Sequence, residues 1–338
     1  MARELTVALV GATGAVGERF LQIMEQRKFP VGELRLLATQ RSAGKQIVFR
    51  GERLTVRETT PEAFDGAQVA FISATTEASR TLCPIARDRG AVVFDDSAAF
   101  RMEPDVPLVV PEINAEDLRA HRGIIATPNC STVPVVLTLA PLRAGRRILR
   151  VVADTYQSVS GSGSAAIAEL REQTAAVLGE RPVTIRQYPK QIAFNAIPQV
   201  DGFLEDGYTK EEWKMIRETR KILHDPDLRM STTCVRVPTV LSHAVAVHAE
   251  FDAPLSAAEA RRLWAQQPGV IVRDDPAQSG YPTPLDCAHQ DAVYVGRARQ
   301  DVSQPNGLAY WCVTDNLRKG AALNIVQMVE WMLADGCL

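Results

Sequence analysis

The stretch Leu5-Thr6-Val7-Ala8-Leu9-Val10-Gly11-Ala12-Thr13-Gly14-Ala15-Val16-Gly17 decides the fold of this chain. Its first six residues form an apolar run typical of a strand that is buried in a parallel sheet. Three regularly spaced glycines follow, and the residues after them, 16–26, have apolar side chains at helical spacing. A glycine turn between a strand and a helix lets the backbone approach a pyrophosphate at the helix N-terminus. The stretch therefore predicts a dinucleotide-binding domain.

Segments with strand and helix patterns continue to alternate after this turn. Apolar runs predict parallel strands over 34–38, 69–73 and 91–95, and the last two are separated by a helical pattern over 77–89. The loop Asp95–Arg101 follows a strand, so we expect it at the carboxyl edge of the sheet, where open α/β sheets bind ligands. This order predicts a Rossmann-like, doubly wound α/β domain over residues 1–131.

The residues after the second predicted strand indicate which cofactor is bound. A site for NAD usually offers an Asp or Glu here to hold the ribose hydroxyls, but this chain offers Thr39-Gln40-Arg41-Ser42-Ala43-Gly44-Lys45. Arg41 and Ser42 suit a 2′-phosphate, so the sequence favours NADP. The alternative for Arg41 is an ordinary solvated surface arginine.

The pattern changes in the second half of the chain. Residues 150–160 alternate and are rich in β-branched side chains, which predicts a half-buried strand. Further elements are expected as helices over 165–178 and 209–223, with Thr209 as the N-cap of the second, and as strands over 231–237 and 243–251. Strands and helices without βα alternation predict an α+β domain over 132–317. We expect a last helix, over 319–333, to return to the first domain, so that residues 318–338 complete it.

Cys130 is the candidate nucleophile. It lies in Asn129-Cys130-Ser131, between two apolar runs that predict a strand and then a helix. A helix N-terminus stabilises a thiolate, and a thiol beside a nicotinamide can form a hemithioacetal, which hydride transfer converts to a thioester. A buried, inert cysteine is the alternative interpretation.

Composition places limits on function. The 338 residues carry a net charge of −2, which gives no electrostatic argument for binding nucleic acid or a membrane surface. No apolar run is long enough to span a membrane, and residues 1–10 have neither a long apolar region nor a cleavage site, so we expect no secretory signal there. The six cysteines are scattered without a C-x-x-C pair, which argues against a metal site and a disulfide framework. These features are typical of a cytoplasmic enzyme.

Six motifs occur in an order that resembles the aspartate-β-semialdehyde dehydrogenase family over essentially the whole chain. They are Gly11–Gly17, Arg41–Lys45, Pro128–Thr132, Tyr156–Gly163, Glu211–Lys214 and Arg236–Pro238. The resemblance implies a two-domain fold like that of glyceraldehyde-3-phosphate dehydrogenase, with a second domain that serves catalysis and dimerisation. It also implies NADPH-dependent reductive dephosphorylation of 4-phospho-L-aspartate to L-aspartate 4-semialdehyde, a reversible step in the biosynthesis of diaminopimelate, lysine, threonine, methionine and isoleucine.

The resemblance also implies roles for individual residues and a homodimer. Cys130 would be the nucleophile and His243 the acid/base, with Gln157 orienting the reacting centre. The substrate and its phosphate would be bound by Arg101, Asn129, Glu211, Lys214 and Arg236. The cofactor would be bound by Gly11, Thr13, Gly14, Ala15, Val16, Arg41, Ser42, Ser160, Gly161 and Asn316.

The residues themselves leave alternatives open. The family usually has Gly-His-Ser or Ala-His-Ser around the catalytic histidine, whereas this chain has Ser242-His243-Ala244, and His248 lies close by. Glu211 and Lys214, at i and i+3 of a helix, could form an ordinary solvated ion pair. An N-acetyl-γ-glutamyl-phosphate reductase would share the cysteine chemistry but would have no use for Glu211. A nucleotide-binding paralogue without catalysis is the alternative that is not an enzyme.

Overall fold

The computed structural model describes residues 4–338, which form two compact units. The first unit contains the chain up to Asn129 together with Ala321–Leu338, and the second contains Cys130–Gly320. The second unit is therefore one continuous stretch of chain, whereas the first is built from two stretches.

A six-stranded parallel sheet forms the centre of the first unit, in the order β5-β2-β1-β6-β7-β8. Its strands are β1 (Leu5–Val10), β2 (Val31–Ala38), β5 (Arg57–Glu58), β6 (Val69–Ile72), β7 (Val92–Asp95) and β8 (Ile124–Ala126). The strand order reverses between β1 and β6, and ligands of open α/β sheets bind at the carboxyl ends of the strands beside such a switch point. The predicted strands of this domain are confirmed. The antiparallel pair β3 (Gln46–Phe49) and β4 (Glu52–Thr55) was not predicted.

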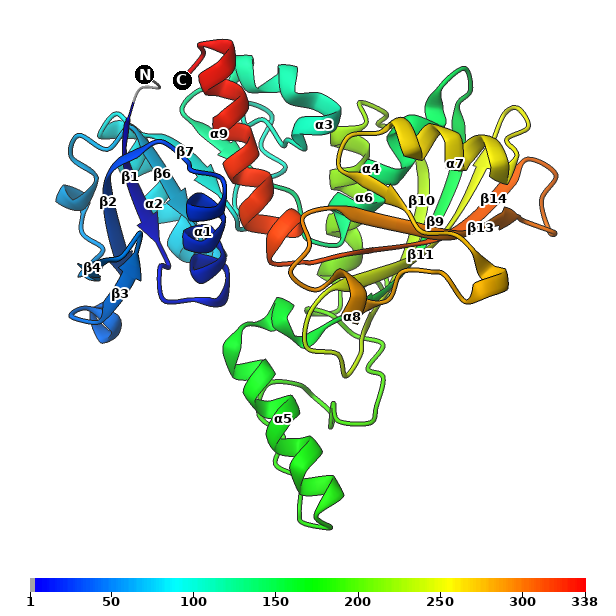
Figure 1. The fold of residues 1–338 in the computed structure, drawn as a ribbon, viewed down its shortest axis with the longest axis horizontal. Coiled ribbons are helices and arrows are strands. Elements are labelled where there is room, and N and C mark those ends of the chain that lie inside the picture. The colour runs from blue at the N-terminus through cyan, green and yellow to red at the C-terminus, as the bar shows by residue number, and fades with distance from the viewer. Residues whose placement is uncertain (1–3) are drawn as a thin grey trace. The chain divides into compact units, whose positions relative to one another are not determined.

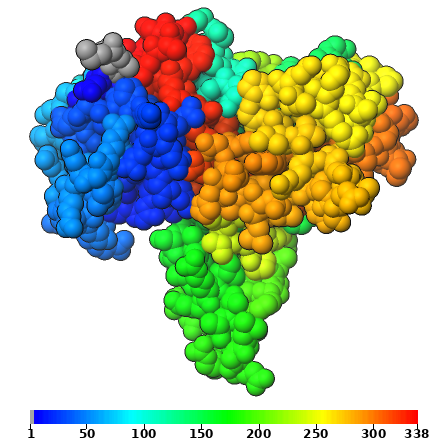
Figure 2. Space-filling model, in the orientation of Figure 1, coloured from blue at the N-terminus to red at the C-terminus, as the bar shows by residue number. Residues whose placement is uncertain are grey.

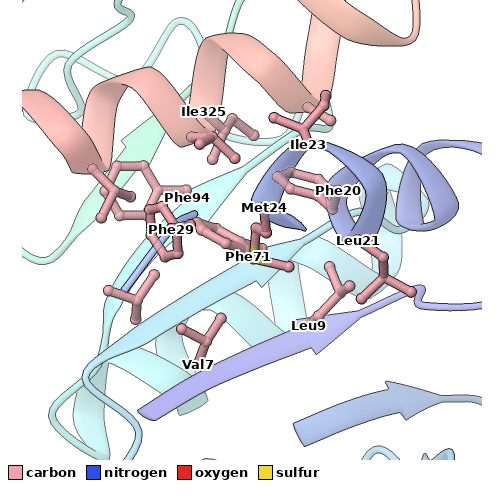
Figure 3. Close-up of a cluster of buried hydrophobic side chains, with 14 of the residues drawn as sticks. Val7, Leu9, Phe20, Leu21, Ile23, Met24, Phe29, Phe71, Phe94 and Ile325 are labelled. Atoms are coloured by element: carbon pink, nitrogen blue, oxygen red, sulfur yellow. The ribbon is translucent and has the colours of Figure 1, made fainter. Parts of the chain in front are cut away.

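The core of the first unit includes a helix from the far end of the chain. The helices are α1 (Ala15–Gln26), α2 (Thr76–Asp88), α3 (Pro111–Asn114) and α9 (Leu323–Asp335). Figure 3 shows Phe20 of α1, Phe71 of β6 and Ile325 of α9 in one buried cluster, and the rings of Phe20 and Phe71 are stacked with centroids 4.9 Å apart. Burial of apolar side chains from both stretches of chain stabilises this unit.

The second unit has a mixed sheet in the order β10-β9-β11-β14-β13-β12. Its strands are β9 (Ile148–Gln157), β10 (Arg229–Arg236), β11 (His243–Phe251), β12 (Val270–Val272), β13 (Val293–Gln300) and β14 (Gly307–Thr314). Three helices, α4 (Thr132–Leu139), α6 (Lys210–Ile222) and α7 (Ala257–Gln266), pack on one face (Figure 1). The short helix α8 (Pro284–Cys287) packs on β14.

Helix α5 (Ser164–Leu178) and the segment after it project from this unit as an arm, drawn in green in Figures 1 and 2. Two buried side chains of α5 hold the returning chain in place. The Glu169 carboxylate accepts the main-chain N–H groups of Arg186 and Gln187, and Gln173 Oε1 accepts those of Ile192 and Ala193. The arm also has a small apolar cluster that includes Ala166, Leu170 and Ile192, so buried polar and apolar contacts order it together.

Two element boundaries differ from those predicted. Strand β9 ends at Gln157 rather than at residue 160, because the N–H groups of Val159 and Ser160 bond to the carbonyls of Thr239 and Val240 in a turn instead of continuing the ladder. The last helix begins at Leu323, after a short π-helical turn over Arg318–Ala322. None of the helices within residues 4–338 is both long and apolar enough to cross a membrane.

Candidate functional site

Four strands of the second unit bring candidate residues to one edge of its sheet. Gln157 ends β9, Arg236 ends the parallel strand β10, and the two residues pair in register. His243 begins the antiparallel strand β11, where it pairs with Gln157 on one side and with Thr314, the end of β14, on the other. Residues from distant parts of the sequence therefore meet at one edge because of strand direction and register.

Cys130 opens this unit, just before the N-terminus of α4. It is half-buried, and none of the six cysteines forms a disulfide. Burial raises the pKa values of the thiols of Cys83, Cys234, Cys287, Cys312 and Cys337. High thiol pKa values make those five poor nucleophiles at neutral pH, so Cys130 is the candidate.

Gly320 leaves room for the nucleophile. A Cβ atom built on Gly320 would lie 3.0 Å from Cys130 Cβ and 3.3 Å from its Cα. Ordinary contacts of Cβ atoms are wider than this, so a side chain at position 320 would displace the cysteine. Gly320 belongs to the turn that follows β14, and its N–H donates to the carbonyl of Asp315.

His243 is completely buried, and its two ring nitrogens have different surroundings. Nδ1 accepts the main-chain N–H of Ser158 at 3.0 Å and lies 3.1 Å from Ser158 Oγ. Nε2 has no hydrogen-bond partner among the described residues, and a Cβ built on Gly161 would be 3.2 Å from it. Burial, and then the charge of Arg236, lower the pKa of His243 to about 3. The imidazole is therefore neutral at physiological pH.

Asn316 connects the segments around His243. Its Oδ1 accepts the hydroxyls of Ser158 (3.2 Å) and Ser160 (3.0 Å) and the main-chain N–H of Ser242 (3.0 Å). Its Nδ2 is buried without a partner among the described residues. A buried amide donor without a partner is rare in folded proteins, and this one is available to a ligand.

Arg236 is buried beside His243. Its Nη1 donates to the carbonyl of Ser158 at 2.7 Å, and its guanidinium carbon lies 5.9 Å from the ring centroid of Tyr188, a residue of the arm. Nε is buried without a partner among the described residues. A cation with an unused donor at this edge suits a carboxylate ligand.

Glu211 and Lys214 lie near the start of α6, which begins with a capping box between Thr209 and Glu212. Lys214 Nζ donates to Glu211 Oε2 (3.2 Å) and to Asp201 Oδ2 (2.8 Å), and Gln157 Nε2 lies 3.4 Å from Glu211 Oε1. Burial lowers the pKa of Lys214, but the carboxylates of Glu211 and Asp201 outweigh burial and raise it above its ordinary value. Glu211 is buried, so the pair is not an ordinary solvated one.

The glycine turn of the first unit has a shape that only glycine fits. Gly11 has φ of +82°, and a Cβ on it would lie 2.1 Å from the carbonyl oxygen of Ser73. A Cβ on Gly17 would lie 2.3 Å from the carbonyl oxygen of Gly11, so this glycine allows α1 to pack against the turn. Gly14 is the N-cap of α1, and Ala15 and Val16 open the helix. The turn thus offers backbone N–H groups at a helix N-terminus, as a pyrophosphate requires.

Arg41 and Ser42 lie in a single 3₁₀ turn, Gln40–Ser42, directly after β2. Arg41 is exposed, whereas Ser42 is buried and its Oγ is 3.4 Å from Thr13 Oγ1. The structure therefore brings the end of β2 beside the glycine turn. An exposed cation next to a hydroxyl at this place fits a 2′-phosphate.

Arg101 and Asn129, both buried, belong to the first unit. Arg101 follows β7 and donates from Nη2 to the carbonyl of Asp96 at 2.9 Å. Asp96 accepts the hydroxyl of Ser73 at 3.2 Å. Burial raises the pKa of Asp96 to about 7, because it outweighs the opposing charge of Arg101, and the charge of Asp95 adds a smaller contribution in the same direction as burial.

The structure separates the two candidate histidines. His248 is exposed and pairs with Asp301 at 3.0 Å, and in the register it faces Val152 and Ala309, far along the strands from Gln157. Odd and even residues of β11 point to opposite faces of the sheet, so His243 and His248 do not share a face. His243 is thus the histidine beside Gln157 and Arg236.

Four residues of the site were not found from the sequence. Ser158, Tyr188, Asp201 and Gly320 each contact a candidate residue. Ser158 lay inside the quoted motif Tyr156–Gly163, which was a usable signal, whereas the other three have no local pattern. Among the described residues, no group of three or more His, Cys, Asp or Glu side chains is placed to hold a metal ion.

Comparisons with known proteins show which family the chain belongs to. A family model described as "Semialdehyde dehydrogenase, NAD binding domain" matches residues 6–121, and one described as "Semialdehyde dehydrogenase, dimerisation domain" matches residues 139–319. The chain is 47% identical to an aspartate-semialdehyde dehydrogenase of Bacillus subtilis (strain 168), over 98% of each chain. The chain belongs to the aspartate-semialdehyde dehydrogenase family.

Other members of the aspartate-semialdehyde dehydrogenase family match equally well. The chain is 47% identical to the enzyme of Aquifex aeolicus (strain VF5), over 98% of this chain and 99% of that one. A crystal structure of aspartate semialdehyde dehydrogenase II of Vibrio cholerae, complexed with ASA, superposes with a TM-score of 0.96 at 43% identity over 99% of each chain. The family, the enzyme class of oxidoreductase and the two-domain fold with an NAD(P)-binding domain, all predicted from the sequence, are confirmed.

Proposed function

We propose that this chain reduces 4-phospho-L-aspartate to L-aspartate 4-semialdehyde with NADPH and releases phosphate, in a reversible reaction. Membership of the aspartate-semialdehyde dehydrogenase family supports the substrate, and the relative from Vibrio cholerae is described as complexed with ASA. The observation that carries the proposal is the edge of the second sheet, where Gln157, Arg236 and His243 meet in the unit that Cys130 opens. The setting would be cytoplasmic biosynthesis of amino acids.

In this mechanism, different residues of the chain carry out different steps. The thiolate of Cys130 attacks the acyl carbon, the C–S bond forms, and the bond to the phosphate oxygen breaks, which leaves a thioester on the cysteine. When bound, NADPH supplies the hydride that reduces this thioester. The oxyanion that results takes a proton from the acid form of His243 and becomes the hemithioacetal hydroxyl, and this hydroxyl returns the proton to His243 as the C–S bond breaks and the thiolate of Cys130 leaves. Gln157 would orient the acyl oxygen.

The charged residues match the charges of the substrate. We propose that Arg236 binds the α-carboxylate and Glu211 the ammonium group, and that Lys214, Arg101 and Asn129 bind phosphate. A substrate with two kinds of anionic group and one cation requires such a set. Because Lys214 already contacts Glu211 and Asp201, its ammonium is held in the charged form before phosphate arrives.

We propose NADP rather than NAD as the cofactor. The glycine turn, with Gly11, Thr13, Gly14, Ala15 and Val16, would hold the pyrophosphate. Arg41 and Ser42 would bind the 2′-phosphate, and Ser160, Gly161 and the unpartnered Nδ2 of Asn316 would contact the nicotinamide end. Arg41→Ala should raise KM for NADP⁺ by roughly ten-fold, the effect of losing a charge-assisted contact, and leave KM for NAD⁺ nearly unchanged. Equal changes for both nucleotides would refute this assignment.

The matched dimerisation domain supports a homodimer, and the sheet face of the second unit that α4, α6 and α7 leave uncovered suits it. Tyr156 is 41% exposed on that face, and its ring lies 5.2 Å from that of Trp311. Trp311 also borders a cavity of about 380 Å³ on that face, together with Ala246 and His248. We propose that a second copy of this chain covers the face.

One assay tests the proposed function. Purified protein should reduce NADP⁺ when given L-aspartate 4-semialdehyde and inorganic phosphate, and omission of phosphate should stop the reaction. Cys130→Ala should abolish turnover but leave NADPH affinity nearly intact, whereas Cys337→Ser, a change at the other half-buried cysteine, should keep most of the activity. Turnover by Cys130→Ala would refute the thioester route. Turnover of N-acetyl-γ-glutamyl phosphate instead would favour the rival reductase. If neither substrate is turned over, the chain would be the non-catalytic paralogue.

A further inference from the structure

The ammonium group of Lys214 is bound by two carboxylates, one on its own helix and one on the loop before that helix. Nζ donates to Glu211 Oε2 at 3.2 Å and to Asp201 Oδ2 at 2.8 Å. An ammonium has three N–H groups, and the third one of Lys214 has no partner among the described residues. One donor therefore remains for a ligand.

Two protein partners fix the direction of this remaining donor, whereas one partner would not. The three N–H groups point to corners of a tetrahedron, so a single hydrogen bond lets the other two rotate about it, and a second one stops this rotation. A lysine side chain that the protein has already ordered does not have to be ordered by its ligand. Binding of an anion to Lys214 should therefore be stronger when both carboxylates hold the ammonium.

Asp201 is held in its place by the hairpin that leads into α6. Its Oδ1 accepts the N–H of Gly202 at 2.7 Å, and the carbonyl of Gly202 accepts the N–H of Lys210, the first residue of α6. Phe203 pairs with Thr209 across the same hairpin. The backbone of Asp201 has φ of +67°, a left-handed conformation that is costly for a residue with a Cβ and is often found at functional sites. The carboxylate is thus fixed relative to the start of the helix that carries the ammonium group.

Asp201 carries a negative charge at the more exposed side of this cluster. Burial raises the pKa of its carboxyl group, but the hydrogen bonds from Lys214 and Gly202 outweigh burial and lower it. The side chain of Asp201 is 37% exposed, against 7% for that of Glu211. Water and salt screen the repulsion between an exposed carboxylate and an anionic ligand, whereas the hydrogen bond of 2.8 Å acts directly on the ammonium. We therefore expect the ordering of Lys214 to outweigh the repulsion.

We propose that Asp201 is a positioning residue for phosphate binding, which together with Glu211 fixes the direction of the N–H group that Lys214 offers to phosphate. The inference rests on the phosphate-binding role of Lys214 in the proposed function. Asp201 itself does not touch the phosphate and transfers no proton, because it acts only through the ammonium group. Loss of its charge should therefore weaken phosphate binding and leave cofactor binding unchanged.

The test compares variants that remove the carboxylate or the ammonium. Asp201→Asn keeps the shape of the side chain, and asparagine tolerates a left-handed backbone. Its single amide oxygen cannot accept from both Gly202 and Lys214, so one contact is lost together with the charge. Lys214→Met removes the ammonium, and the double variant completes the cycle. Glu205→Gln, at an exposed carboxylate of the same hairpin, is the matched control.

Two readouts separate binding from turnover. The dissociation constant of inorganic phosphate is measured by phosphorus NMR without the other substrates, and KM for phosphate, aspartate semialdehyde and NADP⁺ by steady-state kinetics. Asp201→Asn should raise both the dissociation constant and KM for phosphate by about ten-fold, the loss expected for a hydrogen bond between charged groups. KM for NADP⁺ and kcat should change little, and Glu205→Gln should match the wild type. In the Lys214→Met background, Asp201→Asn should change the dissociation constant by less than about two-fold.

Three outcomes would overturn the proposal. Unchanged or tighter phosphate binding in Asp201→Asn would show that the contact does not order the lysine for phosphate. An equal loss in the presence and absence of the Lys214 ammonium would show that Asp201 supports the hairpin and not the lysine. Phosphate binding by Lys214→Met as tight as that of the wild type would remove Lys214 as the ligand. The NMR titration needs no turnover, so the expected pattern in a protein inactive toward aspartate semialdehyde would refute the proposed function and support the role of Asp201.

Discussion

At the scale of single residues, Gly320 sets the space available to the nucleophile. The contact of 3.0 Å that a Cβ would make with Cys130 Cβ forces one of them to move by a few tenths of an ångström. Because small displacements of a reacting atom are costly in rate, Gly320→Ala should lower kcat by about ten-fold while KM changes little. Steady-state kinetics of the phosphate-dependent reaction measure this. Gly202→Ala is the control, since a Cβ there meets nothing within 4 Å, and an equal loss in both variants would contradict the prediction.

Ser242 occupies a position where its backbone conformation favours glycine over any residue with a Cβ. Its φ is +70°, in the left-handed region, and its Oγ is buried without a partner among the described residues. Left-handed backbone costs a residue with a Cβ about 1 kcal/mol, so Ser242→Gly should raise the free energy of unfolding by about that amount. Urea unfolding at pH 7.5 measures it. Ser242→Ala separates the effect of the buried hydroxyl from that of the left-handed backbone, because it removes the hydroxyl but keeps the Cβ. A Ser242→Gly variant less stable than the wild type would contradict the argument.

The sequence singled out residues whose chemistry is rare and missed those that stand out only through their contacts. Cys130 is recognisable beside two apolar runs, and His243 by its spacing from Arg236. Ser158 and Gly320 are common residue types, and their importance follows from atoms that lie far away in the sequence. The choice between His243 and His248 also needed the register of β11, since only the structure shows which one lies beside Gln157.

At the scale of elements, the loop after β7 carries a carboxyl group that titrates near neutral pH. The pKa of Asp96 is raised to about 7 in the folded protein, chiefly by burial, and is near 3.9 in an unfolded chain. The contribution of Asp96 to the free energy of unfolding is therefore fully present below about pH 4, where this carboxyl group is protonated, and is lost as pH rises through 7. Asp96→Asn stays neutral and can keep the bond to Ser73, so it should gain stability relative to the wild type between pH 5 and pH 8.

The size of that gain is on the order of 2 kcal/mol for a partly exposed carboxyl group. Urea midpoints at pH 5 and pH 8 give the difference, and Asp88→Asn, a change at an exposed carboxylate of α2, is the control. A difference between Asp96→Asn and wild type that does not depend on pH would show that the pKa of Asp96 is not raised.

Elements were predicted well where a periodic pattern is long and the ends carry capping residues. The helix α6 begins after Thr209, as its capping box indicates, and β11 spans His243–Phe251 as expected. The ends of β9 and α9 were misplaced, because the turn Val159–Ser162 and the π-helical turn Arg318–Ala322 form through contacts with other segments. Such contacts cannot be predicted from a local sequence pattern.

At the scale of the whole molecule, the prediction concerns assembly. If the uncovered sheet face is the dimer interface, the mass in solution at micromolar concentration should be about twice 37.0 kDa, or a multiple of it. Trp311→Glu would place a charge at the centre of that face and should shift the protein toward the monomer, because an unpaired charge is costly to bury. Light scattering measures both. Val302→Glu, a change at an exposed loop residue, is the control, and a Trp311→Glu variant that stays dimeric would place the interface elsewhere.

The division into two units affects how the protein folds during its synthesis on the ribosome. Helix α9 contributes Ile325, Val326 and Met328 to the core that β1 and α1 begin. The strands of the first unit therefore leave the ribosome long before the helix that finishes their core, and the whole of the second unit is made in between. The unit that is translated first is thus the last to be completed. Until α9 emerges, Phe20 and Phe71 lack part of their apolar cover, and a nascent chain is most exposed to aggregation in that interval.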